Sequence, residues 1–353
     1  MDSRRRCLIS DMTTYIGTAN PGFVPYAVEE LRRRIPGIAI SGLGSDEIFR
    51  FTSGNLDAAE LLRALRRDEP VFLRHLYPLE AEAPLAGDAG QAAAEALAAY
   101  ARTLGDRISG RKVAVQVRKA ANSPFPYSLA EGRDIAVAVL RDFGCEPVAR
   151  DADWIVSVYA TADALLMGCQ APRDNLSDWP GGAVRFRREE GQISRAAFKL
   201  LEAERAFGLP LARFTNALDL GAAPGGWTNV LLERGLKVTA VDPAAMDPRL
   251  ARHPRLHHLR RNAADVTFAP GTFDLLVCDM SWDPHRTCRL VSGLSGALSA
   301  GGSGIITLKL MYRKPMHTLR ELTEAYAEHF DIRRVKQLFH NREEVTMWVR
   351  RKP

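Results

Sequence analysis

The sequence has few cysteines and no long apolar run, and each shortage excludes a class of protein. Its five cysteines are an odd number in 353 residues, and no two of them have a C-x-x-C spacing. We therefore expect no disulfide framework, no bound metal and a cytoplasmic location. No apolar run reaches about 18 residues, so we expect no membrane span and no membrane partner. The N-terminus also lacks the long apolar core of a signal peptide.

Charge is ordinary in amount but positive in balance. Lys and Arg outnumber Asp and Glu by 48 to 42, which gives a formal net charge of +6. This balance permits a polyanionic partner and does not demonstrate one. Basic residues cluster at 32–34, at 184–190 and at the C-terminal VRRKP. A solvated surface explains such clusters equally well.

The length predicts two or three domains, because a single core rarely grows beyond roughly 250–300 residues. The first segment, 1–83, alternates strand-like and helix-like stretches. The second, 84–170, reads as a helix, a strand, a helix that ends at Gly144 and a further strand. The segment 171–192 is rich in Pro and Gly and is interpreted as a linker.

From residue 193 to residue 353, strand-like and helix-like segments alternate strictly. This alternation indicates a parallel α/β sheet, and we expect a doubly wound, Rossmann-like sheet of six or seven strands. The last two strands, IRRVKQLF and EEVTMWVRR, lie close together in the sequence. They are therefore candidates for an antiparallel pair at the edge of the sheet.

A glycine-rich turn between a strand and a helix is the strongest local signal. The sequence LDLGAAPGGWT (218–228) reads as an apolar strand with an acidic residue near its end, a tight turn and the start of a helix. In a doubly wound sheet, ligands bind beside such a turn, at the carboxyl ends of the strands. The cofactor-binding residues expected there are Asp219, Gly221, Ala223, Pro224, Gly225, Gly226 and Trp227.

Two cofactor classes compete for this turn. A dinucleotide site needs G-x-G-x-x-G, whose second glycine lets the backbone approach the pyrophosphate. That position here is Ala223, and Pro224, which has no N–H, follows it. S-Adenosylmethionine carries no phosphate, so the pattern favours this methyl donor over a nicotinamide, and a turn without a ligand is a third interpretation. The absence of G-x-x-x-x-G-K-[ST] argues against an NTPase.

Further polar side chains follow the neighbouring strands. Asp242 ends the next strand, where its carboxylate can accept both ribose hydroxyls of a nucleoside cofactor. Asn262 and Asp265 follow the third strand, and either can bond to the adenine amino group or merely cap a turn. Met280 follows the fourth strand, where packing on adenine and a role in the core are equally compatible with its side chain.

The candidate catalytic residues are two lysines and two carboxylates. Asp279 and Lys309 end the apolar strands FDLLVCDM and GIITLKL, so both are expected at the ligand-binding edge of the sheet. A lysine can deprotonate a weakly acidic hydroxyl only if its pKa is lowered. Lys199 lies outside the apolar stripe of its helix, and Glu344 lies in the last strand. Surface charge is the simpler interpretation of each of these two, and the sequence pattern alone cannot bring the four together.

These segments resemble successive motifs of the FtsJ-like ribose 2′-O-methyltransferases. The similar segments are SRAAFKLLEA, DLGAAPGGWT, LLVCDM, LKL and REEVTMWV. The resemblance implies a Lys–Asp–Lys–Glu tetrad that falls on Lys199, Asp279, Lys309 and Glu344. It is closest to the members that methylate a cytidine ribose in 23S ribosomal RNA, which implies S-adenosylmethionine as cofactor and this RNA as partner. We expect the protein to be a monomer.

The resemblance extends to the N-terminal half. Residues 84–170 resemble a THUMP domain, an RNA-binding module, and GFVPYAVEELRRRIPG resembles the ferredoxin-like unit that precedes it. The implied architecture has a ferredoxin-like domain (1–83), a THUMP-like domain (84–170), a linker (171–192) and a methyltransferase domain (193–353). The segments LRRNAADVTFAP and SWDPHRTCR depart from the family pattern, which leaves the adenine contact and the target base open.

Other functions are kept as alternatives. Exocyclic amine methylation usually follows an Asn/Asp-Pro-Pro-aromatic motif, and this chain has DMSW instead. Methylation at cytosine C5 needs a cysteine nucleophile, but Cys278 precedes Asp279 on its strand and so points to the opposite face. An RNA-binding protein without catalysis would need neither lysine. The clustered His253, His257 and His258 lack partners in a metal-ligand pattern.

Overall fold

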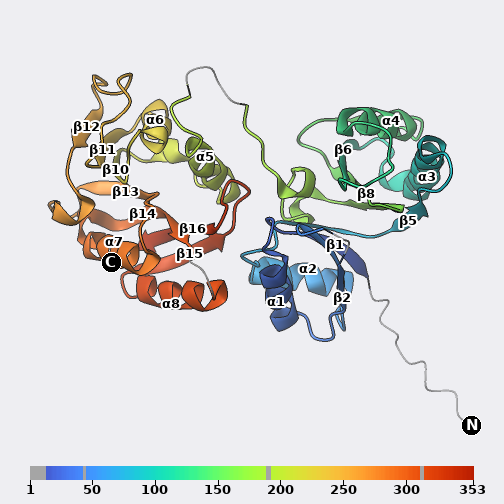
Figure 1. Cartoon of the computed structure of the whole chain (residues 1–353), viewed down its shortest axis with the longest axis horizontal. Helices are drawn as coiled ribbons and strands as arrows, with labels where there is room; N and C mark the ends of the chain where they lie inside the picture. The colour runs from blue at the N-terminus through green and yellow to red at the C-terminus, as the bar shows by residue number, and fades with distance from the viewer. Residues whose placement is uncertain (1–12, 43–44, 188–191, 311–313) are drawn as a thin grey trace, which may run out of the picture. The chain divides into compact units, whose positions relative to one another are not determined.

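The computed structural model describes residues 13–42, 45–187, 192–310 and 314–353 (Figure 1). The chain divides into two compact units, Met1–Ala183 and Val184–Pro353. Cys7 lies outside the described residues, and the other four cysteines are free and buried.

The first unit begins with a four-stranded antiparallel sheet in the order β2-β3-β1-β4. Its strands are β1 (Thr14–Thr18), β2 (Ile40–Gly42), β3 (Ile48–Thr52) and β4 (His75–Pro78). Helix α1 (Val24–Arg34) joins β1 to β2, and α2 (Ala58–Arg67) joins β3 to β4. This βαββαβ succession with this strand order is the ferredoxin-like arrangement that the sequence predicted.

Local chemistry explains where these two helices form. Helix α1 buries Ala27, Leu31 and Ile35, the apolar face expected from their spacing. Helix α2 starts at a capping box, in which the Asp57 carboxylate accepts from Glu60 N at 2.8 Å and the Glu60 carboxylate accepts from Asp57 N at 3.0 Å. The apolar face of α1 thus explains its burial, and the capping box explains where α2 begins.

A second sheet follows in the same unit, with the strand order β5-β9-β8-β6-β7. Its strands are β5 (Ala81–Pro84), β6 (Lys112–Lys119), β7 (Glu146–Pro147), β8 (Trp154–Ala160) and β9 (Ala164–Gln170). Helices α3 (Ala89–Leu104) and α4 (Leu129–Arg141), with the short η1 (Gly105–Arg107), accompany it. The domain boundary expected at residues 83 and 84 falls inside β5, because β5 pairs with β9 of this sheet.

The first part of the expected linker packs on the first unit. It contains two short helices, η2 (Pro172–Asp174) and η3 (Pro180–Gly182). The Gly181 carbonyl accepts from Thr18 Oγ1 at 2.9 Å and from Arg74 Nε at 2.8 Å. Residues 171–183 are thus held by the first unit, and the second unit begins at Val184.

The second unit is built on a seven-stranded sheet in the order β12-β11-β10-β13-β14-β16-β15. Strands β10 to β14 are mutually parallel, and β16 is antiparallel to both β14 and β15. The strands are β10 (Asn216–Leu220), β11 (Lys237–Val241), β12 (Leu256–Leu259), β13 (Phe273–Cys278), β14 (Leu298–Lys309), β15 (Phe330–Lys336) and β16 (Glu344–Arg351). The predicted doubly wound sheet is confirmed. The predicted antiparallel pair is also confirmed, but only β15 lies at the edge.

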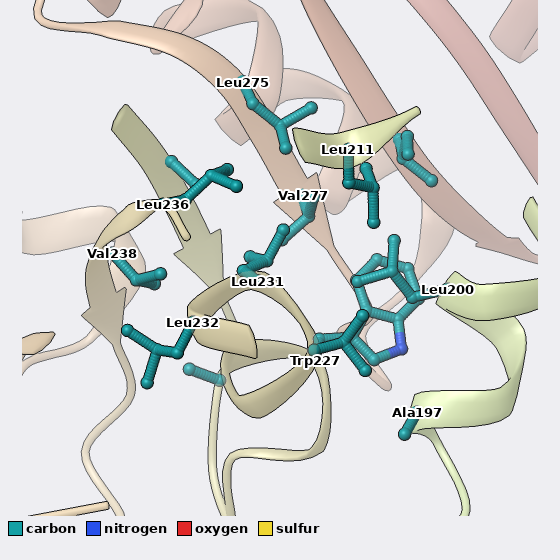
Figure 2. Close-up of a cluster of buried hydrophobic side chains, with 14 of the residues drawn as sticks. Ala197, Leu200, Leu211, Trp227, Leu231, Leu232, Leu236, Val238, Leu275 and Val277 are labelled. Carbon is teal, nitrogen blue, oxygen red and sulfur yellow. The ribbon is translucent and has the colours of Figure 1, made fainter. Parts of the chain in front are cut away.

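Helices cover both faces of this sheet, with α5 and α6 on one face and α7 and α8 on the other (Figure 1). They are α5 (Ala197–Ala206), α6 (Gly226–Glu233), α7 (Pro284–Gly293) and α8 (Pro315–Ala327), with short helices η4 (Leu211–Arg213), η5 (Ala263–Asp265) and η6 (Ser295–Ala297). Leu200 of α5, Leu231 of α6 and Val277 of β13 belong to one buried core between these helices and the sheet (Figure 2). Among the described residues, no helix is long and apolar enough to cross a membrane.

Candidate active site

The candidate site lies where four neighbouring parallel strands end. The glycine-rich turn follows β10, Asp242 follows β11, Asp279 follows β13, and Lys309 is the last residue of β14. These strands are adjacent in the sheet and run in the same direction. Their carboxyl ends therefore meet at one edge, which is the ligand-binding edge of a doubly wound sheet.

Two glycines allow the turn after β10 to take its shape. Gly221 has φ +75° and Gly225 has φ +114°, conformations that side-chain-bearing residues rarely adopt. A Cβ on Gly221 would lie 2.5 Å from Met280 Cγ, and one on Gly225 would lie 2.4 Å from Leu250 Cδ1. Met280 and Leu250 therefore pack tightly against the turn, and a side chain at position 221 or 225 would force the turn to move.

The start of α6 is packed equally closely against the segment before α5. A Cβ on Gly226 would lie 2.9 Å from Ser194 Cβ. Trp227 is buried in the core (Figure 2). Its Nε1 donates to the Ala196 carbonyl at 2.8 Å. The Trp227 indole thus fixes α6 against α5 from inside the core.

Asp219 is a fully buried carboxylic acid at the end of β10. Thr228 Oγ1 donates to its Oδ2 at 2.6 Å. Burial raises the pKa of Asp219 to about 7, the Thr228 hydrogen bond opposes this rise, and the nearby Asp279 and Asp242 carboxylates add to it. The group therefore ties β10 to α6 and changes its charge near neutral pH.

Asp242 braces the turn from the next strand. Its Oδ2 accepts from Ala223 N at 3.2 Å, and its Oδ1 accepts from Ala244 N at 2.8 Å. The side chain is partly exposed, and a carboxylate oxygen has room for more than one hydrogen bond. Asp242 can therefore hold the turn and accept ribose hydroxyls at the same time.

The two candidates for the adenine contact behave differently. Asn262 caps the short helix η5, since its Oδ1 accepts from Ala264 N at 3.0 Å. Asp265 is exposed and is the last residue of that helix. Met280 is buried under the Gly221 turn. The capping bond occupies the Asn262 oxygen but leaves its amide group for other partners.

The four candidate catalytic side chains form one connected network. Lys199 Nζ donates to Asp279 Oδ1 at 2.9 Å and to Oδ2 at 3.1 Å. The same ammonium lies 2.7 Å from Glu344 Oε2. Lys309 Nζ donates to Glu344 Oε1. The order of contacts is thus Asp279, Lys199, Glu344 and Lys309, and the structure brings together residues that the sequence pattern could not.

Strand register explains the last of these contacts. In the antiparallel pair of β14 and β16, Lys309 stands directly opposite Glu344. Facing residues of such a pair have Cβ atoms only about 4.5–5.5 Å apart, so their long side chains meet. Glu344 is buried, whereas its neighbour Glu343 points away and is exposed.

Electrostatics keep the central pair of this network charged. Burial disfavours the Lys199 ammonium, but the Asp279 and Glu344 carboxylates outweigh burial and raise its pKa. Burial likewise disfavours the Glu344 carboxylate, but the two lysines outweigh burial and lower its pKa. At neutral pH Lys199 is therefore a fixed cation and Glu344 a fixed anion.

Thr307 is a fifth member that the sequence analysis missed. Its hydroxyl lies 2.6 Å from Asp279 Oδ1 and 3.3 Å from the Cys278 carbonyl oxygen, so it fixes the Asp279 side chain. Thr307 precedes Lys309 by two residues, and alternate residues of a strand share a face. That spacing in GIITLKL is the signal that could have identified it.

Cys278 does not take part in this network. The thiol is fully buried, and burial raises its pKa to about 12. A thiol that stays protonated at neutral pH is a poor nucleophile. Cys278 is therefore suited to packing in the core.

Comparison with known proteins identifies the domain that carries this site. Residues 192–300 match the family of FtsJ-like methyltransferases. Ribosomal RNA large subunit methyltransferase M of Halorhodospira halophila is 39% identical over 177 residues, which cover 49% of this chain and 51% of that protein. The proteins of the same name from Marinobacter nauticus and Xylella fastidiosa are each 29% identical, over 94% and 96% of this chain.

The extent of these alignments differs. The first spans about half the length of the relative, whereas the other two span 97% and 99% of theirs. The family match contains Lys199, the turn after β10, Asp242 and Asp279. Residues 192–300 of this chain are therefore an FtsJ-like methyltransferase domain, and its methyl donor is S-adenosylmethionine.

Proposed function

We propose that this protein transfers a methyl group to a ribose 2′-hydroxyl of large-subunit ribosomal RNA, at a cytidine. The observation that carries the proposal is the single network of Lys199, Asp279, Lys309 and Glu344 beside the glycine turn. Base methylation by a thiolate is disfavoured, because Cys278 is buried and protonated. The RNA class comes from the named relatives, two of which align over nearly the whole chain.

In the proposed methyl transfer, each residue of the network would have a separate role. S-Adenosylmethionine supplies a methyl group on a positively charged sulfur. The ribose oxygen must lose its proton, or be strongly polarised, as it attacks. Lys199 stays protonated, since its pKa is raised, so it serves as a fixed positive charge. Lys309, which is partly exposed at the end of the network, would steer the 2′-hydroxyl. In its neutral form, after its own proton has passed to solvent, it would accept the proton of that hydroxyl.

The carboxylates have a positioning role in this scheme. Glu344 contacts both lysines and holds their ammonium groups apart in fixed places. Asp279 is itself fixed by Thr307 and anchors Lys199 from the other side. A network held from two strands and a helix keeps its geometry while the substrate enters, which is what proton transfer to a positioned base requires.

For the cofactor, we propose contacts from the turn and from the strands beside it. Gly221, Ala223, Gly225 and Gly226 would line the amino-acid part of the donor, and Asp242 would accept the ribose hydroxyls. The adenine contact stays open between Asn262 and Asp265. For the first unit, we propose RNA binding by the THUMP-like part, residues 84–170. A cytoplasmic location and a monomeric state also remain predictions.

Mapping of the methylated atom tests this function. The protein is incubated with labelled S-adenosylmethionine and large-subunit ribosomal RNA, and the RNA is digested to nucleosides. We expect the label in 2′-O-methylcytidine. Label on a base would contradict ribose methylation, and no label in RNA would contradict the substrate class.

A further inference from the structure

Three partly exposed rings form a cluster beside the catalytic network. Phe186 and Phe198 are stacked with ring centroids 5.6 Å apart and an interplanar angle of 19°. His340 stacks on Phe186 at 5.7 Å and lies against Phe198 at 5.2 Å. We call Phe186, Phe198 and His340 the aromatic cluster. All three residues keep part of their surface exposed, unlike the buried rings of the core.

Partial burial of the His340 ring favours its neutral form. Burial lowers the pKa of His340 below its usual value, and a hydrogen bond that the ring donates to the Val184 backbone only partly opposes this effect. A neutral imidazole carries no tightly bound hydration shell, so a flat, apolar group can approach the His340 ring closely. The cluster as a whole presents uncharged aromatic surface.

The cluster and the catalytic network are built on the same two elements. Phe198 directly precedes Lys199 on α5, and consecutive Cα atoms are only about 3.8 Å apart. His340 lies in the turn that leads into Glu344 at the start of β16. Glu202 joins α5 to the turn before β16, because its carboxylate accepts from Phe339 N at 2.8 Å and from His340 N at 2.9 Å.

Exposed arginines lie close to the cluster residues in the sequence. Arg185 and Arg187 flank Phe186 in the sequence, and both are exposed. Arg195, also exposed, precedes Phe198 by three residues. Glu343 is a nearby exposed acidic residue, with exposed Arg342 beside it. Aromatic rings interleaved with arginines are the pattern with which proteins bind single-stranded nucleic acid, since rings stack on bases and guanidinium groups pair with phosphates.

We propose that the aromatic cluster binds a nucleotide next to the one that is methylated, by stacking its base on the exposed ring surface of the cluster while Arg185 and Arg187 hold its phosphates. This inference rests on the proposed RNA substrate. Stacking does not distinguish strongly between bases, so the cluster contributes affinity and orientation more than sequence choice. It also requires the target to be presented in an unpaired strand, because a base within a duplex has no free face.

The alternative explanation is that the cluster only packs residues 184–187 against α5. Replacement of Phe186 by Leu distinguishes the packing explanation from the stacking proposal, because leucine keeps the apolar bulk and loses the flat ring. The matched control is Phe214→Leu. Phe214 is also partly exposed and also lies beside an arginine, Arg213, whose guanidinium is 5.5 Å from the ring. Phe214 precedes β10, however, and so lies at the end of the sheet away from the site.

The test measures methyl transfer to large-subunit ribosomal RNA and binding of a short single-stranded oligocytidine. For Phe186→Leu we expect the KM for RNA and the Kd for oligocytidine to rise by about 5- to 100-fold, the range for losing one stacked base. The affinity for S-adenosylmethionine and the melting temperature should stay nearly unchanged. Phe186→Tyr, which keeps a ring, should retain most of the affinity, and Phe214→Leu should behave like the wild type.

The outcomes separate this inference from the proposed function. If Phe186→Leu leaves both RNA measurements unchanged in an active enzyme, the stacking role is wrong. If it lowers the melting temperature and changes the binding of both RNA and the methyl donor, the cluster is a packing element and the inference is wrong too. A wild-type protein that does not methylate the RNA contradicts the proposed function itself, and the oligocytidine titration then judges the cluster alone.

Discussion

The molecule contains two clusters of charged side chains that differ in what they can do. In the second unit, Lys199 and Lys309 pair with Asp279 and Glu344. In the first unit, Arg74 and Arg118 share Glu47, at 3.5 Å and 2.9 Å. Both clusters join separate strands through cations and carboxylates. The first-named cluster uses lysine, whose ammonium is a compact charge on a flexible stem, whereas the second uses the planar guanidinium groups of arginine.

The cations of the two clusters are also held differently. Arg74 is only 4% exposed, and its guanidinium donates to the Gly181 carbonyl and to Asn20 as well as facing Glu47. Lys309, with 28% of its side chain exposed, has one carboxylate partner among the described residues. A buried guanidinium with contacts to three different segments links them permanently, whereas a partly exposed ammonium with one carboxylate partner remains available to a substrate. The difference explains why one cluster is structural and the other is a candidate active site.

Lys309→Ala should give the largest effect, because it removes a positioned proton acceptor from the open end of the network. We expect turnover to fall by roughly 10²–10⁴-fold, typical of such a group. Binding of S-adenosylmethionine should be nearly intact, since the glycine turn and Asp242 are untouched. Single-turnover methylation and calorimetry check the two halves of this prediction. Loss of donor binding would show that Lys309 supports the cofactor site instead.

Arg74→Met should destabilise the first unit and leave the chemistry alone. The substitution removes the buried hydrogen bonds of Arg74 to the Gly181 carbonyl and to Asn20, and one of the two cations that face Glu47. We therefore expect the free energy of unfolding to fall by about 2–4 kcal/mol. Urea unfolding measures it. The control is Arg33→Met, which breaks the exposed pair with Glu29 and should cost less than about 1 kcal/mol. Equal effects of the two substitutions would refute the structural role given to Arg74.

Asp242→Ala should weaken binding of S-adenosylmethionine by about 1–3 kcal/mol, the usual cost of losing hydrogen bonds to a charged group. The measurement is calorimetry of the purified protein. Asp331→Ala, at an exposed position on β15, serves as the control and should bind normally. Unchanged affinity of Asp242→Ala would mean that its carboxylate braces the turn without holding the ribose.

His75 should make the first unit sensitive to acid. Burial, followed by the charges of Arg118 and Arg74, lowers its pKa to about 3, from the ordinary value of 6.5. The unfolded chain therefore binds the proton first, so stability is complete above about pH 6.5 and is lost as pH falls toward 3. The slope is about 1.4 kcal/mol per pH unit for one proton.

A difference measurement isolates this effect. Asp219 acts in the opposite direction, because its raised pKa favours proton uptake by the folded chain below about pH 7. Urea unfolding of the wild type and of His75→Gln between pH 4 and 7 should show a shallower loss of stability in the variant. Parallel curves would mean that His75 titrates normally in the folded protein.

Sequence reasoning succeeded where the signal was local. The strands of the second unit are apolar runs that end in residues such as Asp219 and Asp279, and the turn of 221–226 lies between a strand and a helix. Strand β9 was missed because all seven of its residues are buried, which removes the alternation that marks a strand. Strand β5 was also missed, because it is only four residues long and ends in a proline.

The catalytic network could not be predicted from local sequence patterns, because its contacts join residues that are far apart in the sequence. Lys199 and Asp279 are 80 positions apart, and Lys309 and Glu344 are 35 apart. Each residue alone is compatible with surface charge. Only the resemblance to a known family grouped them from the sequence, and only strand register and the placement of α5 bring them into contact. Thr307 escaped notice because a threonine within an apolar strand looks like part of the core.

The most direct test of the central claim is the activity of Lys309→Arg. Arginine keeps the positive charge and can still pair with Glu344, but a guanidinium does not deprotonate near neutral pH. If Lys309 accepts the proton of the 2′-hydroxyl, the variant should bind S-adenosylmethionine normally and lose turnover nearly as completely as Lys309→Ala. A variant with close to wild-type turnover would contradict proton abstraction by Lys309 and leave it only an electrostatic or orienting role.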